Sequence, residues 1–506
     1  MMSALYTGTS GMKALSQGMS SIGNNLANTN TVGFKAAMML YQDMTSSDVT
    51  GTGGNYANGN IGGNLSQLGH GVSVMVNRTM YKQGAFEPGN DPMDMGISGI
   101  GFFGVQKDGE LQFTRAGNFR FTKDGDLVDP NGYGLMGSKI VNGVVSNTVE
   151  PIKLDLSTGG GHMTMQPRAT SSVTLIENLG SVEDKTSGAN EFFSLAGAWN
   201  GTNTPPLGKG QYSHASAITV YDATGKAQQV TAYFDHVGTY DGKNVYEYVL
   251  ATNPAADGSA RAKTEAAGLL AAGTMTFSST GEIMDMTMFD APTANHTDFS
   301  TWTPSGFDAD GRPAVKADFG AGAQAISMDF GLETGGTWSH GYADAAAVAA
   351  NPAALHTGPG KPAAANHSTS YQGSSANISS SQNGYAEGNL MNLQVTRDGY
   401  VSGNYNNGQS QDLFRVPLYR FTSQDNLRHE GGNRYSAGPD AGNVEYGYPN
   451  EENFGALYGQ HLEQSNVDMA TEFASMIMTQ RGFQMNSKVI TTSDTMLQRA
   501  LELKRQ

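Results

Sequence analysis

The sequence NVDMATEFASMIMTQRGFQMNSKVITTSDTMLQRALELKRQ, residues 466–506, decides how this chain is organised. Apolar residues recur in it every seven positions, and a second apolar row runs beside its far end, which is helical spacing. The stretch contains no proline and a single glycine, so it predicts one continuous helix of about 60 Å at a rise of about 1.5 Å per residue. We expect its apolar stripe to be buried against a partner. The first row is Met469, Met476, Phe483, Ile490 and Leu497, and the second is Val489, Met496 and Leu503.

A similar pattern at the other end of the chain supplies a partner. Leu5, Met12, Met19 and Leu26 recur every seven residues, and Leu15 and Ile22 lie between them at the offset that completes an a/d seam. The two segments are predicted to pair, so that the long intervening body is carried on a two-helix stalk. Taken singly, each segment also fits a core helix of an ordinary bundle, because three to four heptads is the minimum for a coiled coil. The residues expected in the assembly interface are Leu5, Met12, Leu15, Met19, Ile22, Leu26, Met469, Phe473, Met476, Phe483, Ile490, Met496, Leu497 and Leu503.

The N-terminal helix is weak by itself. Gly8, Gly11, Gly18 and Gly23 each disfavour a helix interior by up to about 1 kcal/mol relative to alanine. We therefore expect this segment to gain its helicity from packing. Residues 24–35 (NNLANTNTVGFK) are rich in Asn, Thr and Gly, which favour local turns, so they are predicted to end the helix.

Composition bounds the class of protein. The 506 residues suffice for three or four domains, and the 66 glycines favour turn-rich β structure. The net charge of −16 argues against nucleic-acid binding. Residues 1–35 carry +2 and residues 466–506 carry +1, so the middle holds −19 and both ends are close to neutral.

The chain contains no cysteine, which excludes disulfides and thiolate metal sites. Its first 30 residues lack the charged and apolar regions of a signal peptide, and no stretch approaches the length of a membrane span. We therefore expect either a cytoplasmic protein or one exported by a route other than Sec.

Turn signals divide the middle into a nested set of β domains. We predict terminal helices over 1–30 and 466–506, a connecting arm over 31–71, an inner β domain built from 72–146 and 371–465, and one or two outer β domains over 147–370. The inner domain is expected to consist of hairpins closed by Asp108-Gly109, Asp124-Gly125, Asn131-Gly132, Asp398-Gly399 and Asn407-Gly408. Residues 345–365 are rich in Ala and Pro and are expected to form a surface loop. The predicted fold class is mainly β with paired α-helical termini.

The motifs of catalysis are missing or out of context. The glycines Gly99, Gly101 and Gly104 spell a dinucleotide-binding pattern, but a strand and not a helix is predicted to follow them. The histidines show no metal-ligand spacing, and no nucleophile elbow is present. Paired carboxylates of the glycosidase type cannot be judged from sequence, because their separation depends on the tertiary structure. We predict no catalytic, cofactor or metal site.

Three blocks of the sequence resemble the axial proteins of the bacterial flagellar rod and hook. They are ALYTGTSGMKALSQGMSSIGNNLANTNTVGFK (4–35), GFFGVQKDGELQFTRAGNFRFTKDGDLVDPNGYGLMG (101–137) and the C-terminal helix around TQRGFQMNSKVITTSD (479–494). The segments NLSQLGHGVSV (64–74) and YDATGKAQQVTAYF (221–234) resemble hook more than rod proteins. The family motif residues are Asn24, Asn25, Asn28, Gly33, Phe34, Gln480, Arg481, Gly482, Phe483 and Gln484.

The resemblance implies a non-enzymatic, self-assembling subunit of the flagellar hook, a flexible hollow joint that transmits torque to the filament. It implies export by the flagellar type III apparatus and an extracellular location, while the charge and the lack of a long apolar stretch predict no nucleic-acid partner and no membrane span. The implied partners are other copies of the chain, the distal rod protein, the hook cap, the hook-length ruler and the hook–filament junction protein. A distal rod protein is the alternative within the family. A secreted adhesin or glycan-active enzyme on a helical stalk is the alternative of another class.

Overall fold

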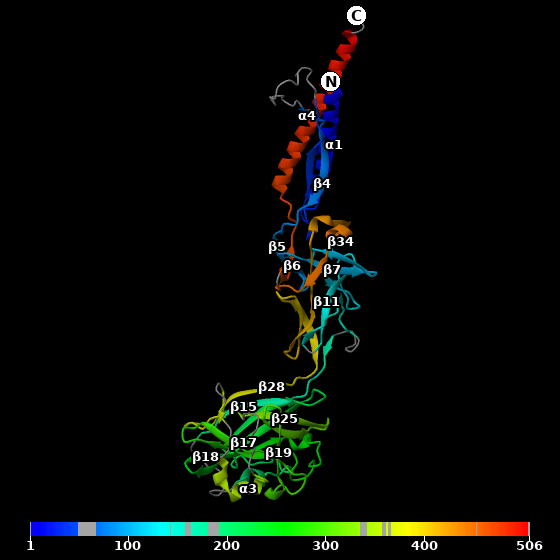
Figure 1. Cartoon of the computed structure of the whole chain (residues 1–506). Coiled ribbons are helices and arrows are strands. Elements are labelled where there is room, and N and C mark those ends of the chain that lie inside the picture. The colour runs from blue at the N-terminus through cyan, green and yellow to red at the C-terminus, as the bar shows by residue number, and fades with distance from the viewer. Residues whose placement is uncertain are drawn as a thin grey trace. The chain divides into compact units, whose positions relative to one another are not determined.

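The computed structural model describes residues 2–48, 67–141, 143–156, 163–180, 192–333, 342–356, 361–362, 366–451 and 453–503. The chain folds as two units (Figure 1): unit 1 is Met1–Met163 with Leu390–Gln506, and unit 2 is Thr164–Asn389. Strands predominate, and a long helix lies at each terminus. The predicted fold class, mainly β with α-helical termini, is confirmed.

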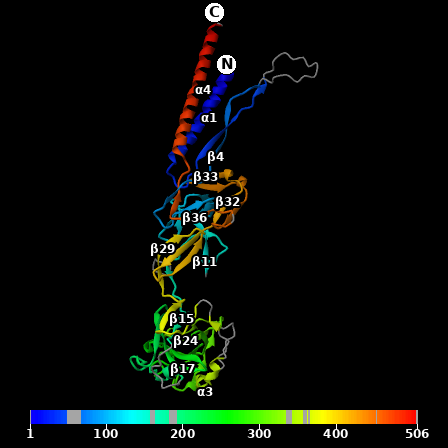
Figure 2. The same ribbon diagram turned by 90° about the vertical axis from the view of Figure 1, so that its left-hand side faces the viewer.

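The two terminal helices lie side by side and antiparallel in unit 1 (Figures 1 and 2). α1 spans Met2–Ala27 and α4 spans Met469–Leu503. α1 ends where Asn28 turns its side chain back to donate to the Asn24 carbonyl at 2.9 Å. α4 begins after Asp468, whose carboxylate accepts from the Ala470 amide at 2.9 Å and caps the helix. Hydrogen bonds from Thr471 lower the pKa of Asp468, which keeps the cap charged.

Small side chains form the buried face of α1, where it packs on α4 and on a neighbouring strand. A Cβ atom added to Gly8 would lie 2.9 Å from Ile490 Cγ1, and one added to Gly482 would lie 3.1 Å from Leu15 Cδ1. The helices therefore approach closely because glycine leaves room. The large apolar side chains predicted to be buried on α1 are only half-buried and do not form its buried face. The buried residues of α1 are Gly8, Gly11, Ala14, Gly18, Ser21 and Asn25.

A two-stranded ribbon packs against α1. β1 (Ala37–Asp43) pairs antiparallel with β4 (Val72–Thr79), from Ala37 opposite Thr79 to Asp43 opposite Val72. β4 had been expected to open the inner β domain, but its strand partner is β1 and it contacts α1. Most of the predicted arm between these strands lies outside the described residues. The short strands β2 (Ser47–Asp48) and β3 (Gln67–Leu68) extend the ribbon.

The β domain of unit 1 is built from two segments of the chain, one before unit 2 in the sequence and one after it. β11 (Gly134–Val141) pairs with β7 (Phe102–Lys107) from before the insertion and with β31 (Ser410–Arg415) from after it. The β7–β8 hairpin closes at Asp108 and Gly109, both with positive φ, as the Asp-Gly signal predicts. A core that includes Phe103, Val105 and Val416 lies within it. Its longer remaining strands are β5 (Phe86–Pro88), β6 (Met95–Ser98), β8 (Glu110–Thr114), β29 (Gly388–Val395), β30 (Tyr400–Tyr405), β32 (Leu418–Phe421), β33 (Leu427–Gly431), β34 (Arg434–Ala437), β35 (Val444–Gly447), β36 (Ala456–Gly459) and β37 (His461–Glu463). Short strands are β9 (Arg120–Phe121), β10 (Leu127–Val128), β12 (Val144–Val145) and β13 (Glu150–Pro151).

Unit 2 contains two main sheets, with separate cores on the two faces of the larger one, and a two-stranded pair of β26 (Leu332–Glu333) with β27 (Lys361–Pro362). Its five-stranded sheet has the order β23-β24-β25-β15-β28, and its larger sheet runs β16-β17-β18-β19-β21-β22. The short strands near the sheet edges are β21 (Phe289–Asp290), β22 (Thr303–Pro304) and β23 (Gly306–Phe307). One core includes Val173 and Phe234, and the other includes Trp199 and Trp302 beneath the short helices α2 (Ser194–Ala198) and α3 (Ala345–Ala350). The main strands are β15 (Ser172–Asn178), β16 (His214–Tyr221), β17 (Ala227–Tyr240), β18 (Lys243–Thr252), β19 (Leu269–Phe277), β24 (Pro313–Asp318), β25 (Ala323–Asp329) and β28 (Ala376–Gln382).

The boundaries of the insertion differ from those predicted. Residues 147–156 stay with unit 1, where β13 (Glu150–Pro151) pairs with β11. Residues 371–389 belong to unit 2, because β28 pairs with β15. The sequence shows where strands begin and end but not which strand each one joins. The expected loop over 345–365 is also wrong in part, because α3 buries Ala345 and Val348.

Candidate assembly interface

Five exposed apolar side chains form a row along α4, on a side that the chain leaves in water. The row spans about 25 residues, which is about 38 Å of helix. Its members are between 44% and 77% exposed. A monomeric protein rarely exposes a contiguous apolar surface of this kind. The residues of this exposed stripe are Met478, Met485, Val489, Met496 and Leu503.

The predicted seven-residue row of α4 is only partly buried. Met469 is 53% exposed and Phe483 is 37% exposed, whereas Met476, Ile490 and Leu497 are half-buried. A strict seven-residue row drifts by about 20° per heptad around a straight helix. Over four heptads it therefore turns from a solvent-facing direction toward α1. The other predicted residues, Phe473, Met496 and Leu503, are exposed.

The predicted residues of α1 flank its buried face. All six are half-buried, so each presents part of its side chain to solvent. Leu15 contacts α4 at Gly482. They are Leu5, Met12, Leu15, Met19, Ile22 and Leu26.

The N-terminal family motif connects α1 to the ribbon and to α4. Asn25 is buried and exchanges two hydrogen bonds with the backbone of Ala37, at 2.8 and 2.9 Å. It also donates to Glu472 on α4 at 2.9 Å. Gly33 has a φ of 70°, and a Cβ there would lie 2.6 Å from the Ala116 amide nitrogen, so only glycine fits. Asn24 is exposed, Asn28 is half-buried, and Phe34 is buried.

The C-terminal motif plays a different part. Gln480, Arg481 and Gln484 are exposed, and so contribute little to the fold of the single chain. Gly482 is placed against α1, where it admits Leu15.

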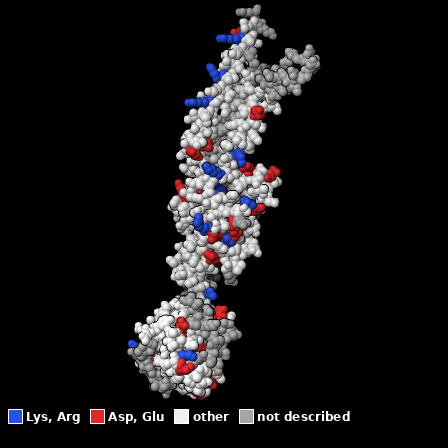
Figure 3. Space-filling model, turned by 60° about the vertical axis from the view of Figure 1, so that its left-hand side comes forward, with Lys and Arg blue, Asp and Glu red and all other residues white. Residues whose placement is uncertain are grey.

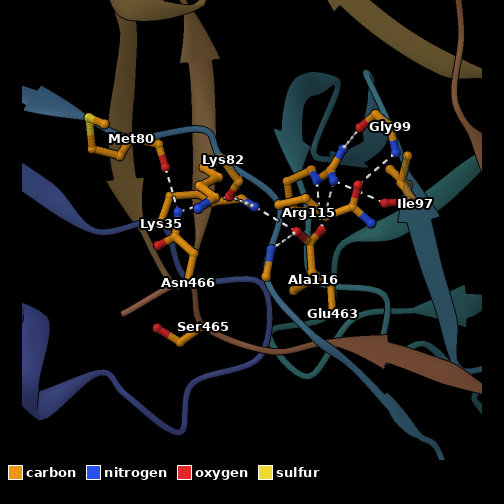
Figure 4. A network of polar contacts seen from close by, with 12 residues as sticks. Lys35, Met80, Lys82, Ile97, Gly99, Arg115, Ala116, Glu463, Ser465 and Asn466 are labelled. Atoms are coloured by element: carbon orange, nitrogen blue, oxygen red, sulfur yellow. Dashed lines mark hydrogen bonds and ion pairs between the residues drawn. The ribbon is translucent and has the colours of Figure 1, made fainter. Parts of the chain in front are cut away.

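A buried ionic junction lies where the helices meet the β domain (Figure 4). The Glu463 carboxylate is fully buried and pairs with Lys35 Nζ at 2.6 Å and with Arg115 at 2.8 Å. Arg115 also donates to the carbonyls of Gly99, Gly101 and Ile97, at 2.7 to 3.0 Å. Lys35 comes from the end of the N-terminal motif, Arg115 from the β domain, and Glu463 from β37, the strand that precedes α4. We call Lys35, Arg115 and Glu463 the junction residues.

Asn466 completes the connection at the entry to α4. Its side chain accepts from the Ala36 amide at 2.7 Å and donates to the carbonyls of Met80 and Lys82 at 2.7 and 2.8 Å (Figure 4). Burial lowers the pKa of both Lys35 and Arg115, and the Glu463 charge opposes this shift. Removing one member of such a network leaves an uncompensated buried charge, which destabilises a fold by about 3 to 5 kcal/mol.

Sequence reasoning missed the junction. Lys35 lies within the recognised motif, but nothing in the spacing of Arg115 and Glu463 marks them as partners 348 residues apart. Arg115 and Glu463 stand within apolar β patterns, but this is only a weak indication of burial, because most charged residues lie at the surface.

The surface of unit 1 changes character along its length. On the face drawn in Figure 3, the helical end is mostly uncharged with a few basic and acidic side chains, whereas charges of both signs are more numerous over the β domain. Among the described residues, no helix is long and apolar enough to cross a membrane. The same residues hold no cluster of three or more His, Cys, Asp or Glu suited to a metal ion.

Four family models match the chain in sequence order. Residues 5–35 match the flagella basal body rod protein, and residues 96–182 match the flagellar hook protein FlgE/F/G D1 domain. Residues 194–385 match the flagellar basal body protein FlaE D2 domain, and residues 458–503 match the flagellar basal body rod FlgEFG protein C-terminal region.

Full-length relatives agree with these matches. The chain is 27% identical to flagellar hook protein FlgE of Borreliella burgdorferi and 28% identical to that of Treponema pallidum, with all of each chain covered. Flagellar basal-body rod protein FlgG of Bacillus subtilis is 38% identical, but over only 27% of this chain and 51% of its own length. A crystal structure of Helicobacter pylori flagellar hook protein FlgE2 aligns with a TM-score of 0.46 at 15% identity, over 75% of this chain and 100% of that one. The full-length alignments and the ordered domain matches show that this chain belongs to the flagellar hook protein family, as a structural subunit of the flagellar hook.

Proposed function

We propose that copies of this chain polymerise helically into a hollow, flexible tube that acts as a universal joint between the flagellar motor and the filament. The exposed stripe of α4 is the observation that carries this proposal. A row of Met, Val and Leu side chains in water is unfavourable by roughly 25 cal/mol per Å² of apolar surface. Its burial between subunits supplies a driving force for assembly.

From the contacts within one chain, we propose two roles for the predicted interface residues. Ile490 and Leu15 touch the other terminal helix through glycines, so they hold the pair together. Met469, Phe473, Phe483, Met496 and Leu503 are exposed in the single chain and are the residues proposed to contact neighbouring copies. The half-buried residues of α1 contribute to both.

The two units suit different mechanical roles. In unit 1, close helix packing and the buried junction provide rigid connections that transmit torque from the helices to the β domain. Unit 2 carries 10 Lys and Arg against 21 Asp and Glu, a net charge of −11. Contacts between such acidic, well-solvated surfaces bury little apolar area, so they can slide as the tube bends.

The other parts of the proposal follow from family membership. The chain is exported through the flagellar type III apparatus and assembles outside the cell. Its proposed partners besides itself are the distal rod protein, the hook cap, the hook-length ruler and the hook–filament junction protein.

A single charged substitution on the exposed stripe tests the polymerisation. Met485→Asp removes an apolar contact that only a neighbouring copy can make, so the purified chain is expected to remain monomeric in sedimentation and electron microscopy. Its thermal unfolding should match that of the unmodified chain. The control is Thr491→Asp, at an exposed position about 120° around the same helix from Met485 and off the exposed stripe. Normal tubes from Met485→Asp, or no polymer from the unmodified chain, would contradict the proposal.

A further inference from the structure

We infer that the free end of α4 in one copy docks in a groove at the base of the helix pair of another copy, so that subunits join head to tail. This inference rests on the proposed polymerisation and specifies one of its contacts. It concerns two surfaces at opposite ends of α4, one hollow and one projecting.

The groove lies among three elements of unit 1. It has a volume of about 390 Å³ and is lined by α1, by β1 and by the first turns of α4. Its lining includes four large apolar side chains that are between 38% and 68% exposed, namely Met38, Tyr41, Met80 and Met478. Glu472 is the one charged residue among the described residues that line it.

The projecting surface is the last two turns of α4. α4 has 35 residues and α1 has 26, and the antiparallel pairing places Gly8 against Ile490. α1 begins only six residues before Gly8, so the last turns of α4 extend beyond it (Figures 1 and 2). Met496, Leu501 and Leu503 are exposed there by 56%, 64% and 77%.

Charge and spacing match the projecting end to the groove. Met496, Arg499 and Leu503 follow one another at i, i+3 and i+7, so they lie on one side of the helix. This side presents two apolar side chains with a cation between them. The groove offers apolar side chains beside the Glu472 carboxylate, so Arg499 would meet an opposite charge.

The pairing must occur between different copies. About 24 residues separate the middle of the groove wall on α4 from Arg499, which is about 36 Å along one continuous helix. A chain cannot bring these two surfaces together within itself. Two complementary patches at opposite ends of one rigid element form a heterologous contact, which generates an open helical polymer when the rotation does not close.

Charge reversal in the full-length chain tests the contact. Arg499→Glu is expected to raise the critical concentration for polymerisation about tenfold, because it sets two carboxylates against each other. Glu472→Arg should do the same, and the double variant should return to within about twofold of the unmodified chain. Lys123→Glu reverses an exposed charge in the β domain and is expected to leave the critical concentration unchanged.

Glu472 also accepts a hydrogen bond from Asn25, so its substitution could affect the fold of the single chain. A second rescue experiment therefore leaves Glu472 unchanged. Met38→Lys places a cation in the groove without touching that hydrogen bond, so it should restore polymerisation to Arg499→Glu. Single variants that polymerise like the unmodified chain would overturn the inference. So would folded double variants that stay as defective as Arg499→Glu. In either case the unmodified chain still forms tubes, which distinguishes this failure from failure of the proposed function.

Discussion

Each unit buries a glutamate, and the surroundings of the two carboxyl groups differ. In unit 1, Glu463 is surrounded by two cations and by the Gly84 amide, which donates to it at 2.9 Å. In unit 2, no cation among the described residues acts on the buried Glu247. Burial raises the pKa of Glu247 to about 7, while the Ser194 hydroxyl and the Leu195 amide donate to its Oε1 and partly oppose the shift. Asp235 lies directly opposite it in the β17–β18 register and adds a further raising effect.

This environment predicts that unit 2 loses stability as the pH rises. The folded pKa of Glu247 lies above its ordinary value of 4.5, so the folded state binds the proton more tightly. Stability is therefore full below pH 4.5 and falls as the pH rises to 7, by up to about 3 kcal/mol. Glu247→Gln removes this titration and keeps the shape and an acceptor oxygen. We expect it to flatten the difference in urea unfolding free energy between pH 5 and pH 8.

The matched control is Glu265→Gln, at an exposed position of the same unit, which should leave the pH dependence unchanged. An equal pH dependence in Glu247→Gln and the unmodified chain would show that the carboxyl is already ionised at no cost in the folded state.

At the scale of elements, the helix pair depends on residues that are poor helix formers. Each glycine of α1 weakens the isolated helix, yet Gly8 allows α4 to approach at a distance that a methyl group would not permit. Replacing glycine by alanine is therefore expected to have opposite effects on stability at different positions of α1.

Gly8→Ala and Gly23→Ala separate these effects. Both gain helix propensity of up to about 1 kcal/mol. At Gly23 no atom lies within 4 Å of an added Cβ, so the variant should unfold at a higher temperature by circular dichroism at 222 nm. At Gly8 the Cβ would meet Ile490, so the helices must separate and the overpacking should destabilise the pair by about 1 to 3 kcal/mol. Equal shifts in both variants would mean that the helices do not pack through Gly8.

At the scale of the whole molecule, the chain leaves unit 1 and returns to it at adjacent points. The Leu390 amide donates to the Met163 carbonyl at 3.0 Å, and Thr164 lies opposite Asn389 in an antiparallel pair. Unit 1 also has its own cores around Phe103 and Phe102, without residues of unit 2. It therefore has the means to fold without the insertion.

Replacing residues 164–389 by Asn-Gly tests this independence. The dipeptide favours the two-residue hairpin turn that would join the paired residues Met163 and Leu390. We expect calorimetry of the full chain to show two transitions, and the shortened chain to keep the one that belongs to unit 1 within a few degrees. Loss of that transition would show that unit 2 stabilises unit 1.

The sequence by itself determined the elements and the family. Seven-residue spacing predicted both terminal helices, Asp-Gly and Asn-Gly dipeptides predicted hairpin turns, and three blocks of sequence resembled the flagellar axial proteins. These signals are local, because periodicity and turn chemistry depend on neighbouring residues in the chain.

Only the tertiary structure decided which residues meet. It showed that glycines face large apolar side chains between the helices, Gly8 against Ile490 and Gly482 against Leu15, and that a row running through Met485 is left in water. It moved the borders of the insertion, since strand partners are chosen across long stretches of chain. It also brought Lys35, Arg115 and Glu463 together, because a buried charge requires a partner but its spacing in sequence does not say which one.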